Sequence, residues 1–240
     1  MYKKLACIFF LCFFVALDSH IIFIHIPKCA GTSMNSMLRK QFPQKNLILQ
    51  ERYIESLIYG GVENEYSDVM DTLLKKYPIN PKYELVSGHF PVWYLKRNHM
   101  HYSTAFKFTV LRDPIERVLS NHRHLKQQVH LTRSSSPLGV KPNLMCKMLA
   151  SDYSAEGEDL LRQAIETLNE LDAVLFVDNL QESVPSLFKT LGLPFVKVEH
   201  ANKSIPMYIN PKHLEIIAKN NELDIRLYKY AVEHFKPERI

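Results

Sequence analysis

The sequence is poor in glycine and has no block of like charge, and each shortage argues against a class of protein. Only seven of its 240 residues are glycine, which disfavours a β-sandwich or a repeat array, because such folds change direction at many tight turns. We find no internal repeat and no low-complexity tract. The net charge is only +5, without a basic block or an RNA-binding motif, so a nucleic-acid partner is not indicated. This mild positive excess suits an anionic cofactor and an anionic acceptor.

The four cysteines are too scattered for a disulfide framework or a zinc site. Cys7 and Cys12 lie in an N-terminal apolar run, Cys29 lies in a loop, and Cys146 lies in a helical pattern. No pair has the spacing of zinc ligands with partners nearby. We therefore expect buried thiols and no bound metal.

The N-terminal apolar run is shorter than the roughly 20 residues of a typical membrane-spanning helix. It covers Leu5 to Leu17 and follows two lysines. A short basic start before an apolar run of this length is typical of a secretory signal peptide. We predict that residues 1–19 are a cleaved signal, with a short membrane anchor as the second alternative. A start codon placed too early on a cytosolic protein is the third.

The rest of the chain has the composition of one folded domain, which we place at residues 20–240. Hydrophobic residues make up 46% of the sequence and charged residues 23%, as in globular proteins. Apolar runs alternate with amphipathic segments, which predicts a three-layer α/β/α fold around a central parallel sheet. The predicted strands lie near 21–26, 46–50, 83–89, 105–111 and 172–178, and the predicted helices over 32–42, 53–77, 114–127, 143–150, 155–171, 181–191 and 211–235.

The first motif is a strand, a tight loop and a helix between Ile21 and Met34. The apolar strand ends at Pro27, and the helical pattern restarts at Thr32. A helix N-terminus offers backbone N–H groups and a partial positive charge, which bind phosphate or sulfate. Lys28 and two hydroxyl groups lie in the same loop. The alternative is a capping turn with a surface lysine.

The second motif begins where the strand over 105–111 ends. Arg112 follows that strand, Asp113 is a plausible N-cap of the next helix, and Ser120 lies two turns along it. Arg112 should lie at the carboxyl edge of the sheet, where open α/β folds bind ligands, and its forked guanidinium suits phosphate. Pairing with an acidic neighbour on the surface is the alternative, which we prefer only for Arg117 and Arg123.

The first loop is not a Walker A sequence, because Lys28 precedes Gly31 instead of following it. The order Pro-Lys-x-x-Gly-Thr-Ser resembles the 5′-phosphosulfate loop of sulfotransferases, whose donor is 3′-phosphoadenosine 5′-phosphosulfate (PAPS). The form His-Ile-Pro-Lys-x-Ala-Gly-Thr-Ser is most similar to the carbohydrate branch, which includes the heparan and dermatan 2-O- and 6-O-sulfotransferases. The resemblance implies a P-loop NTPase-like sulfotransferase fold in which the 5′-phosphosulfate is bound by Lys28, Cys29, Ala30, Gly31, Thr32 and Ser33.

The resemblance also implies roles for residues outside this loop. Arg112 and Ser120 match the positions that bind the donor's 3′-phosphate. Asn202-Lys203-Ser204 matches a loop near the donor, which places Lys203 among the donor-binding residues, although the triplet is also a glycosylation sequon. Lys28 would neutralise charge on the leaving oxygen. No metal is required.

His89 is the candidate base. Transfer to a hydroxyl requires removal of its proton, and histidine titrates in a suitable range. His89 follows Gly88 at the end of a predicted strand, as the catalytic histidine does in the 2-O-sulfotransferases. A structural histidine is the alternative, with Glu51 and Glu84 as the next candidate bases. We expect His25 to be packed on its strand. Five other histidines have no such placement: His20, His99, His101, His122 and His124.

We thus expect a PAPS-dependent sulfotransferase acting on a hydroxyl, in particular that of an anionic glycan such as a glycosaminoglycan, in the Golgi lumen or at its membrane. Cytoplasmic location is the alternative if the N-terminal run is not a signal. Two other functions stay open. One is a non-catalytic protein that binds the donor or a glycan. The other is a P-loop kinase, which the displaced lysine and the lack of an evident Mg²⁺-binding aspartate disfavour.

Overall fold

A computed structural model describes residues 20–42, 47–50, 84–99, 101–127, 142–194, 197 and 210–236. The described strands form one parallel five-stranded sheet with the order β2-β3-β1-β4-β5. Their bounds are β1 Ile21–Ile24, β2 Leu47–Gln50, β3 Leu85–Gly88, β4 Phe106–Leu111 and β5 Ala173–Phe176. The predicted parallel sheet is confirmed, and so is each predicted strand within a few residues.

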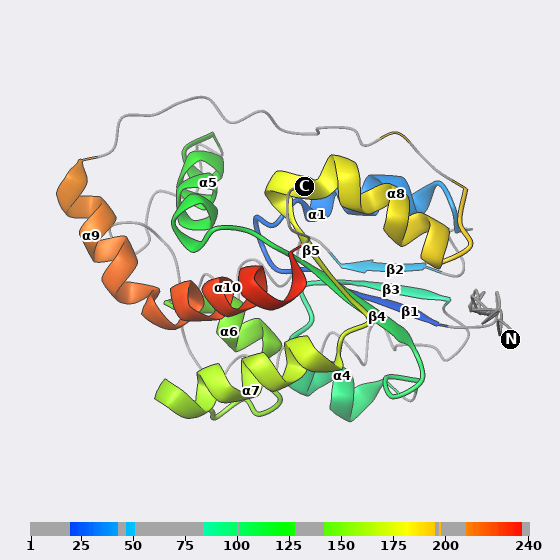
Figure 1. Ribbon diagram of the computed structural model, residues 1–240, viewed down its shortest axis with the longest axis horizontal. Helices are drawn as coiled ribbons and strands as arrows, with labels where there is room; N and C mark the ends of the chain where they lie inside the picture. Colours follow the sequence, from blue (N-terminus) through cyan, green and yellow to red (C-terminus); the bar gives the residue numbers. More distant parts are fainter. Residues whose placement is uncertain are drawn as a thin grey trace, which may run out of the picture.

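Helices cover both faces of the sheet and give three layers (Figure 1). Helices α1 and α8 lie on one face, whereas α4, α6, α7 and α10 lie on the other. The bounds are α1 Gly31–Arg39, α4 Val92–Asn98, α5 Pro114–Gln127, α6 Leu144–Leu149, α7 Gly157–Glu170, α8 Leu180–Thr190, α9 Pro211–Asn220 and α10 Glu222–Phe235, with a 3₁₀ turn at Val177–Asn179.

The central strand β1 shows why the sequence forms this arrangement. Ile21 and Phe23 pack with the helices on one face, and Ile22 and Ile24 pack with the helices on the other. All four side chains are buried. A strand that is buried on both faces has a continuous apolar sequence instead of an alternating one.

Hydrogen bonds fix the neighbours of β1 close to where it ends. The Thr109 hydroxyl of β4 donates to the Ile24 carbonyl oxygen at 2.8 Å. On the other side, the Ser87 hydroxyl of β3 donates to Oδ1 of Asn35 in α1 at 2.6 Å, and both side chains are buried. The carboxyl ends of β1, β3 and β4 therefore lie next to one another on the same side of the sheet. Open α/β folds bind their ligands at this side.

The helices differ from the prediction in two places. The predicted helix over 211–235 is two helices, because the chain turns at the buried Asn221, whose side-chain oxygen accepts from the Asn143 N–H at 3.3 Å. Helix α4 was not predicted, because only a loop was expected after Pro91; its seven residues carry a short apolar pattern.

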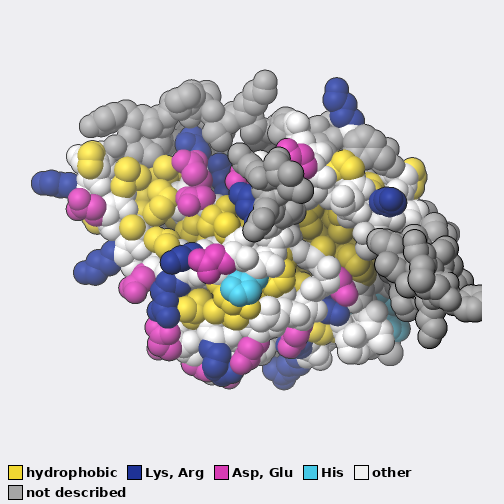
Figure 2. Space-filling model, in the orientation of Figure 1, with side chains coloured by type: hydrophobic (Ala, Val, Ile, Leu, Met, Phe, Trp, Pro, Cys, Tyr) yellow, Lys and Arg dark blue, Asp and Glu magenta, His cyan; other side chains and the backbone are white. Residues whose placement is uncertain are grey.

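Several predictions lie outside the described residues: the helix over 53–77, the N-terminal segment 1–19, the candidate base Glu51, and Lys203. Within the described ranges, no helix has both the length and the apolar character needed to cross a membrane. On the face shown in Figure 2, acidic and basic side chains are interspersed and are not separated by sign.

Candidate active site

The loop between β1 and α1 has the backbone of an anion-binding turn. Lys28 and Ala30 adopt left-handed conformations, with φ of 68° and 57°. Successive backbone N–H groups in such a turn form a concave nest for anions. Ala30 gives α1 no side-chain cap, and the first turn of α1 carries no acidic residue. The N-terminus of α1 thus offers its partial positive charge to an anion.

Gly31 is required by the close approach of His25. A Cβ atom at position 31 would overlap the His25 imidazole ring. His25 is buried, as predicted, and its ring stacks on Phe23 with centroids 5.5 Å apart. Its other neighbour is His89, with ring centroids at 4.3 Å. The glycine thus lets the loop close over a pair of histidines.

His89 directly follows β3 and is 2% exposed. Burial lowers the pKa of its imidazole to about 4, and the nearby charge of Lys28 lowers it further. The same two causes, together with His89 itself, hold the pKa of His25 well below its usual value. The buried Nδ1 atoms of both rings have no hydrogen-bond partner among the described residues. Both imidazoles are therefore neutral at pH 7, the state in which a base can accept a proton.

Arg112 connects the second motif to the first. Its Nη1 atom donates to the Lys28 carbonyl oxygen at 3.4 Å. Its Nη2 atom also lies 3.5 Å from Oε2 of Glu116, so the alternative, pairing with an acidic neighbour, is present as well. Ser120 is half-buried on α5, and the Asp113 carboxylate caps that helix as predicted, accepting from the Glu116 N–H at 3.0 Å.

His124 belongs to the same cluster, and the sequence analysis missed it. It is half-buried on α5, and its pKa is lowered by burial and by Lys28. Residues four apart on a helix lie on one face, so the spacing from Ser120 could have revealed it. Lys28 is thus close to three histidines, of which one follows β1, one follows β3 and one lies on α5.

Arg117 corrects a prediction. We expected a surface ion pair, but Arg117 is fully buried. Its Nη2 atom lies 3.5 Å from Oδ1 of Asn221, and its charge acts on the buried Asp224. Arg117 lies on the face of α5 that turns toward α9 and α10, which the sequence pattern could not identify. Arg123 does pair with Glu116, at 3.4 Å, as predicted.

The remaining candidates have different positions. Cys29 is buried, and its pKa is raised to about 12 by burial, so the thiol is neutral. Cys146 is buried too, as predicted. Thr32 is exposed and Ser33 is half-buried in the first turn of α1. Glu84 precedes β3 and lies at the amino end of this strand, whereas His89 lies at its carboxyl end.

No group of three or more histidine, cysteine, aspartate or glutamate side chains in the described ranges is placed to hold a metal ion. The side chains described at this edge include one lysine, one arginine, hydroxyl groups and neutral imidazoles around an anion-binding turn. Such a set binds a phosphate or sulfate ester and removes a proton beside it.

Comparisons with known proteins bear on the fold and the family of the chain. No curated protein matches the chain. Among solved structures, a sulfotransferase from Alicyclobacillus acidocaldarius superimposes with a TM-score of 0.51 at 15% identity, covering 90% of this chain and 96% of its own, which supports the fold alone. Mouse sulfotransferase SULT7A1, solved with PAP, gives 0.41 at 14% identity and covers 87% of this chain and 66% of its own. The sequence model of the Sulfotransferase family matches residues 12–231, so the chain belongs to the sulfotransferase family.

Proposed function

We propose that this protein transfers a sulfuryl group from PAPS to a hydroxyl group of a carbohydrate, with His89 as the base. The observation that supports this most strongly is the convergence of Lys28, His89 and Arg112 on one sheet edge. Lys28 is close enough to lower the pKa of His89, and its carbonyl oxygen accepts from Arg112. Family membership supports the class of reaction.

The described residues fit the phosphosulfate end of this donor. The left-handed residues Lys28 and Ala30, the uncapped helix end and the absence of an acidic residue in the first turn all favour a dense negative charge. Lys28 would hold the oxygen that links phosphorus to sulfur. Arg112 and Ser120 would hold the 3′-phosphate, for which Arg112 would have to exchange its contact with Glu116.

PAPS supplies a sulfuryl group on a phosphate leaving group. In the proposed step the acceptor oxygen forms a bond to sulfur, and its proton passes to the His89 imidazole. The bond from sulfur to the 5′-phosphate oxygen breaks, and that oxygen keeps the electron pair, which Lys28 stabilises. Burial keeps His89 neutral, so a ring nitrogen is available to accept the proton, and its pKa of about 4 makes it a weaker base than an unperturbed imidazole.

Three single variants test this assignment. With radiolabelled PAPS, His89→Ala should lower turnover by roughly 10² to 10⁴ and leave PAP binding intact. The acid limb of the pH profile of kcat/KM, which reports the free-protein pKa of about 4, should disappear in that variant.

Arg112→Ala should weaken PAP binding measured by calorimetry, and Lys28→Ala should mainly lower turnover. Equal affinity of the wild type for PAP and for its 3′-dephosphorylated form would refute the Arg112 and Ser120 assignment.

The same assays separate the alternative functions. A non-catalytic donor-binding protein would bind PAP and transfer nothing. A kinase would transfer phosphate from ATP with Mg²⁺, which this proposal does not predict.

We also propose that residues 1–19 are a signal segment or anchor and that residues 20–240 act as the catalytic domain in the secretory pathway. The support is the basic and apolar pattern of the N-terminus. N-terminal sequencing after expression in a secretory host should give a mature chain that starts just before β1. An uncleaved, active protein in the cytoplasm would contradict this proposal.

A further inference from the structure

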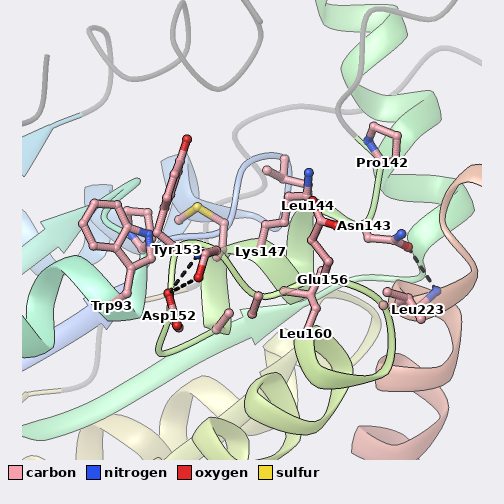
Figure 3. A pocket seen from close by; sticks show the side chains of 16 residues that line it. Trp93, Pro142, Asn143, Leu144, Lys147, Asp152, Tyr153, Glu156, Leu160 and Leu223 are labelled. Atoms are coloured by element: carbon pink, nitrogen blue, oxygen red, sulfur yellow. Dashed lines mark hydrogen bonds between the residues drawn. The ribbon is translucent and has the colours of Figure 1, made fainter. Parts of the chain in front are cut away.

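A cavity of about 500 Å³ lies beside helix α6, and we call it the α6 pocket. Residues from α4, α6, α10 and the segment before α7 line it. Trp93 and Tyr153 lie at one end, Asn143 and Leu223 at the other, and Lys147 and Glu156 between them (Figure 3). Its volume is in the range of pockets that enclose a small molecule.

One wall of the α6 pocket is close in sequence to the candidate active site. Pro91 lines it and is only two residues from His89. On its other wall, the N-terminus of α6 is fixed by Asp224, whose carboxylate accepts from the N–H groups of Met145 and Cys146 at 3.0 and 2.8 Å. The charge of Asp224 also acts on the Cys29 thiol in the β1–α1 loop. Helix α6, which lines the pocket, thus packs close to the β1–α1 loop that would bind the donor.

Two aromatic rings make one end of the α6 pocket. Trp93 and Tyr153 meet edge to face, with ring centroids 5.6 Å apart. Trp93 is held further by its backbone N–H, which donates to the Ala150 carbonyl oxygen at 3.1 Å. Tyr153 is 46% exposed. A large exposed ring beside a fixed one offers a flat apolar surface with a polar tip.

The charges around the α6 pocket do not favour a polyanion. The lining residues include one ammonium group, on Lys147, and two carboxylates, on Asp152 and Glu156. One oxygen of Asp152 accepts from the N–H and the hydroxyl of Ser154, both at 2.9 Å. Lys147 and Glu156 are exposed and form no ion pair with the rest of the described chain. A ring with several hydroxyl groups can accept from the ammonium and donate to the carboxylate.

We propose that the α6 pocket binds an uncharged sugar unit of the acceptor, which stacks on Trp93 and Tyr153 and bonds to Lys147 and Glu156. This inference rests on the proposed sulfotransferase function and narrows its substrate class. It departs from the anionic acceptor expected from the family resemblance, because two carboxylates against one ammonium repel a uronate or a sulfated sugar. The sugar next to the pocket would present its hydroxyl group to His89.

Trp93 allows a test that does not depend on catalysis. It is the only tryptophan in the chain, so intrinsic fluorescence reports on the α6 pocket. We expect saturable fluorescence changes when the full chain is titrated with neutral chitotriose, and weaker binding of an unsulfated chondroitin tetrasaccharide, which carries uronates. Tyr153→Ala and Glu156→Gln should each raise the Kd for chitotriose roughly tenfold, as expected for loss of one hydrogen bond to a charged group or one stacking surface.

Matched controls lie on α9, away from the α6 pocket. Ile216→Ala removes a side chain that is 49% exposed, and Glu215→Gln neutralises an exposed carboxylate; both should keep the wild-type Kd. No fluorescence change with chitotriose, tighter binding of the chondroitin tetrasaccharide, or unchanged Kd in both pocket variants would each overturn the inference. PAP calorimetry is measured separately. If the wild type does not bind PAP, the donor assignment is refuted. If the wild type binds PAP but not chitotriose, only the proposed role of the α6 pocket is refuted.

Discussion

At the scale of single residues, the site depends on one lysine that acts on several imidazoles. Lys28 lowers the pKa of His25, His89 and His124, although these side chains come from three different elements. A lysine that binds the donor would therefore also keep the base neutral. This double role links the two halves of the proposed reaction, because any change in the charge near Lys28 also changes the proton affinity of His89.

Replacing Lys28 tests this link. Lys28→Met keeps most of the side-chain volume and removes the charge, so the pKa of His89 should rise from about 4 toward its usual value without reaching it, because burial is the larger cause. NMR titration of the imidazole C–H signals measures the shift. The control is Lys219→Met on α9, which should leave the His89 titration as it is. An unchanged His89 pKa in Lys28→Met would show that the lysine ammonium does not face the imidazole.

At the scale of elements, the start of α1 is set by the contact between Gly31 and His25. Gly31→Ala should displace either the histidine or the loop, because the added methyl overlaps the imidazole. We expect weaker PAP binding and a loss of about 1–3 kcal/mol in the free energy of unfolding, the usual cost of overpacking. Calorimetry and urea unfolding measure the two effects.

A double variant identifies the cause. In His25→Ala the space beside position 31 is open, so adding Gly31→Ala to it should cost less than adding Gly31→Ala to the wild type. Equal costs in both backgrounds would mean that the histidine is not what requires the glycine.

Helices α5, α6 and α10 are joined by a buried polar cluster. Burial raises the pKa of Asp224, and the Arg117 guanidinium acts against that rise. Arg117→Met should therefore leave a buried carboxylate without its cation and lower the free energy of unfolding by about 3–5 kcal/mol. Arg162→Met on α7, whose exposed guanidinium pairs with the exposed Asp159 and Glu166, should change it by less than about 1 kcal/mol. Urea unfolding of both variants checks this. Similar losses in the two would contradict the assigned difference.

At the scale of the whole molecule, the sequence predicted the parts of the fold that local patterns determine. The apolar runs of β1 and β4 and the Asp113 cap of α5 follow from hydrophobic period and capping chemistry, and Gly192, with φ of 66°, follows the end of α8. The face of α5 that another helix covers depends on tertiary packing, which the local sequence pattern does not contain. For that reason the pattern predicts Arg117 on the surface and does not single out His124.

The sequence pattern named those candidate residues that lie just past the carboxyl end of a strand. His89 and Arg112 directly follow β3 and β4, Lys28 lies in the loop after β1, and parallel strands all end on the same side of the sheet. The pairing of His25 with His89, and the α6 pocket, arise from elements that the chain brings together over long distances. No periodicity in the sequence indicates such contacts.

The buried histidines also predict how the stability of the protein depends on pH. The pKa of His89 is about 4 in the folded protein, against 6.5 for an unperturbed histidine, and the pKa of His25 is lowered too. Between these values the unfolded chain binds more protons than the folded one. The free energy of unfolding should therefore fall as the pH is lowered from about 6.5 to about 4, by up to about 1.4 kcal/mol per pH unit for each such group.

Urea unfolding at a series of pH values measures this slope. Asp224 acts in the opposite direction, because its raised pKa lets the folded state bind a proton first; a comparison of variants removes its contribution. In His89→Asn the slope between pH 6.5 and 4 should be smaller than in the wild type, since one of the groups that bind protons only on unfolding is gone. Above pH 7 the imidazoles are neutral in both states, so there the two proteins should show parallel curves. Equal slopes below pH 6.5 would show that His89 is accessible to protons in the folded protein and is not the neutral, buried base on which the proposed mechanism depends.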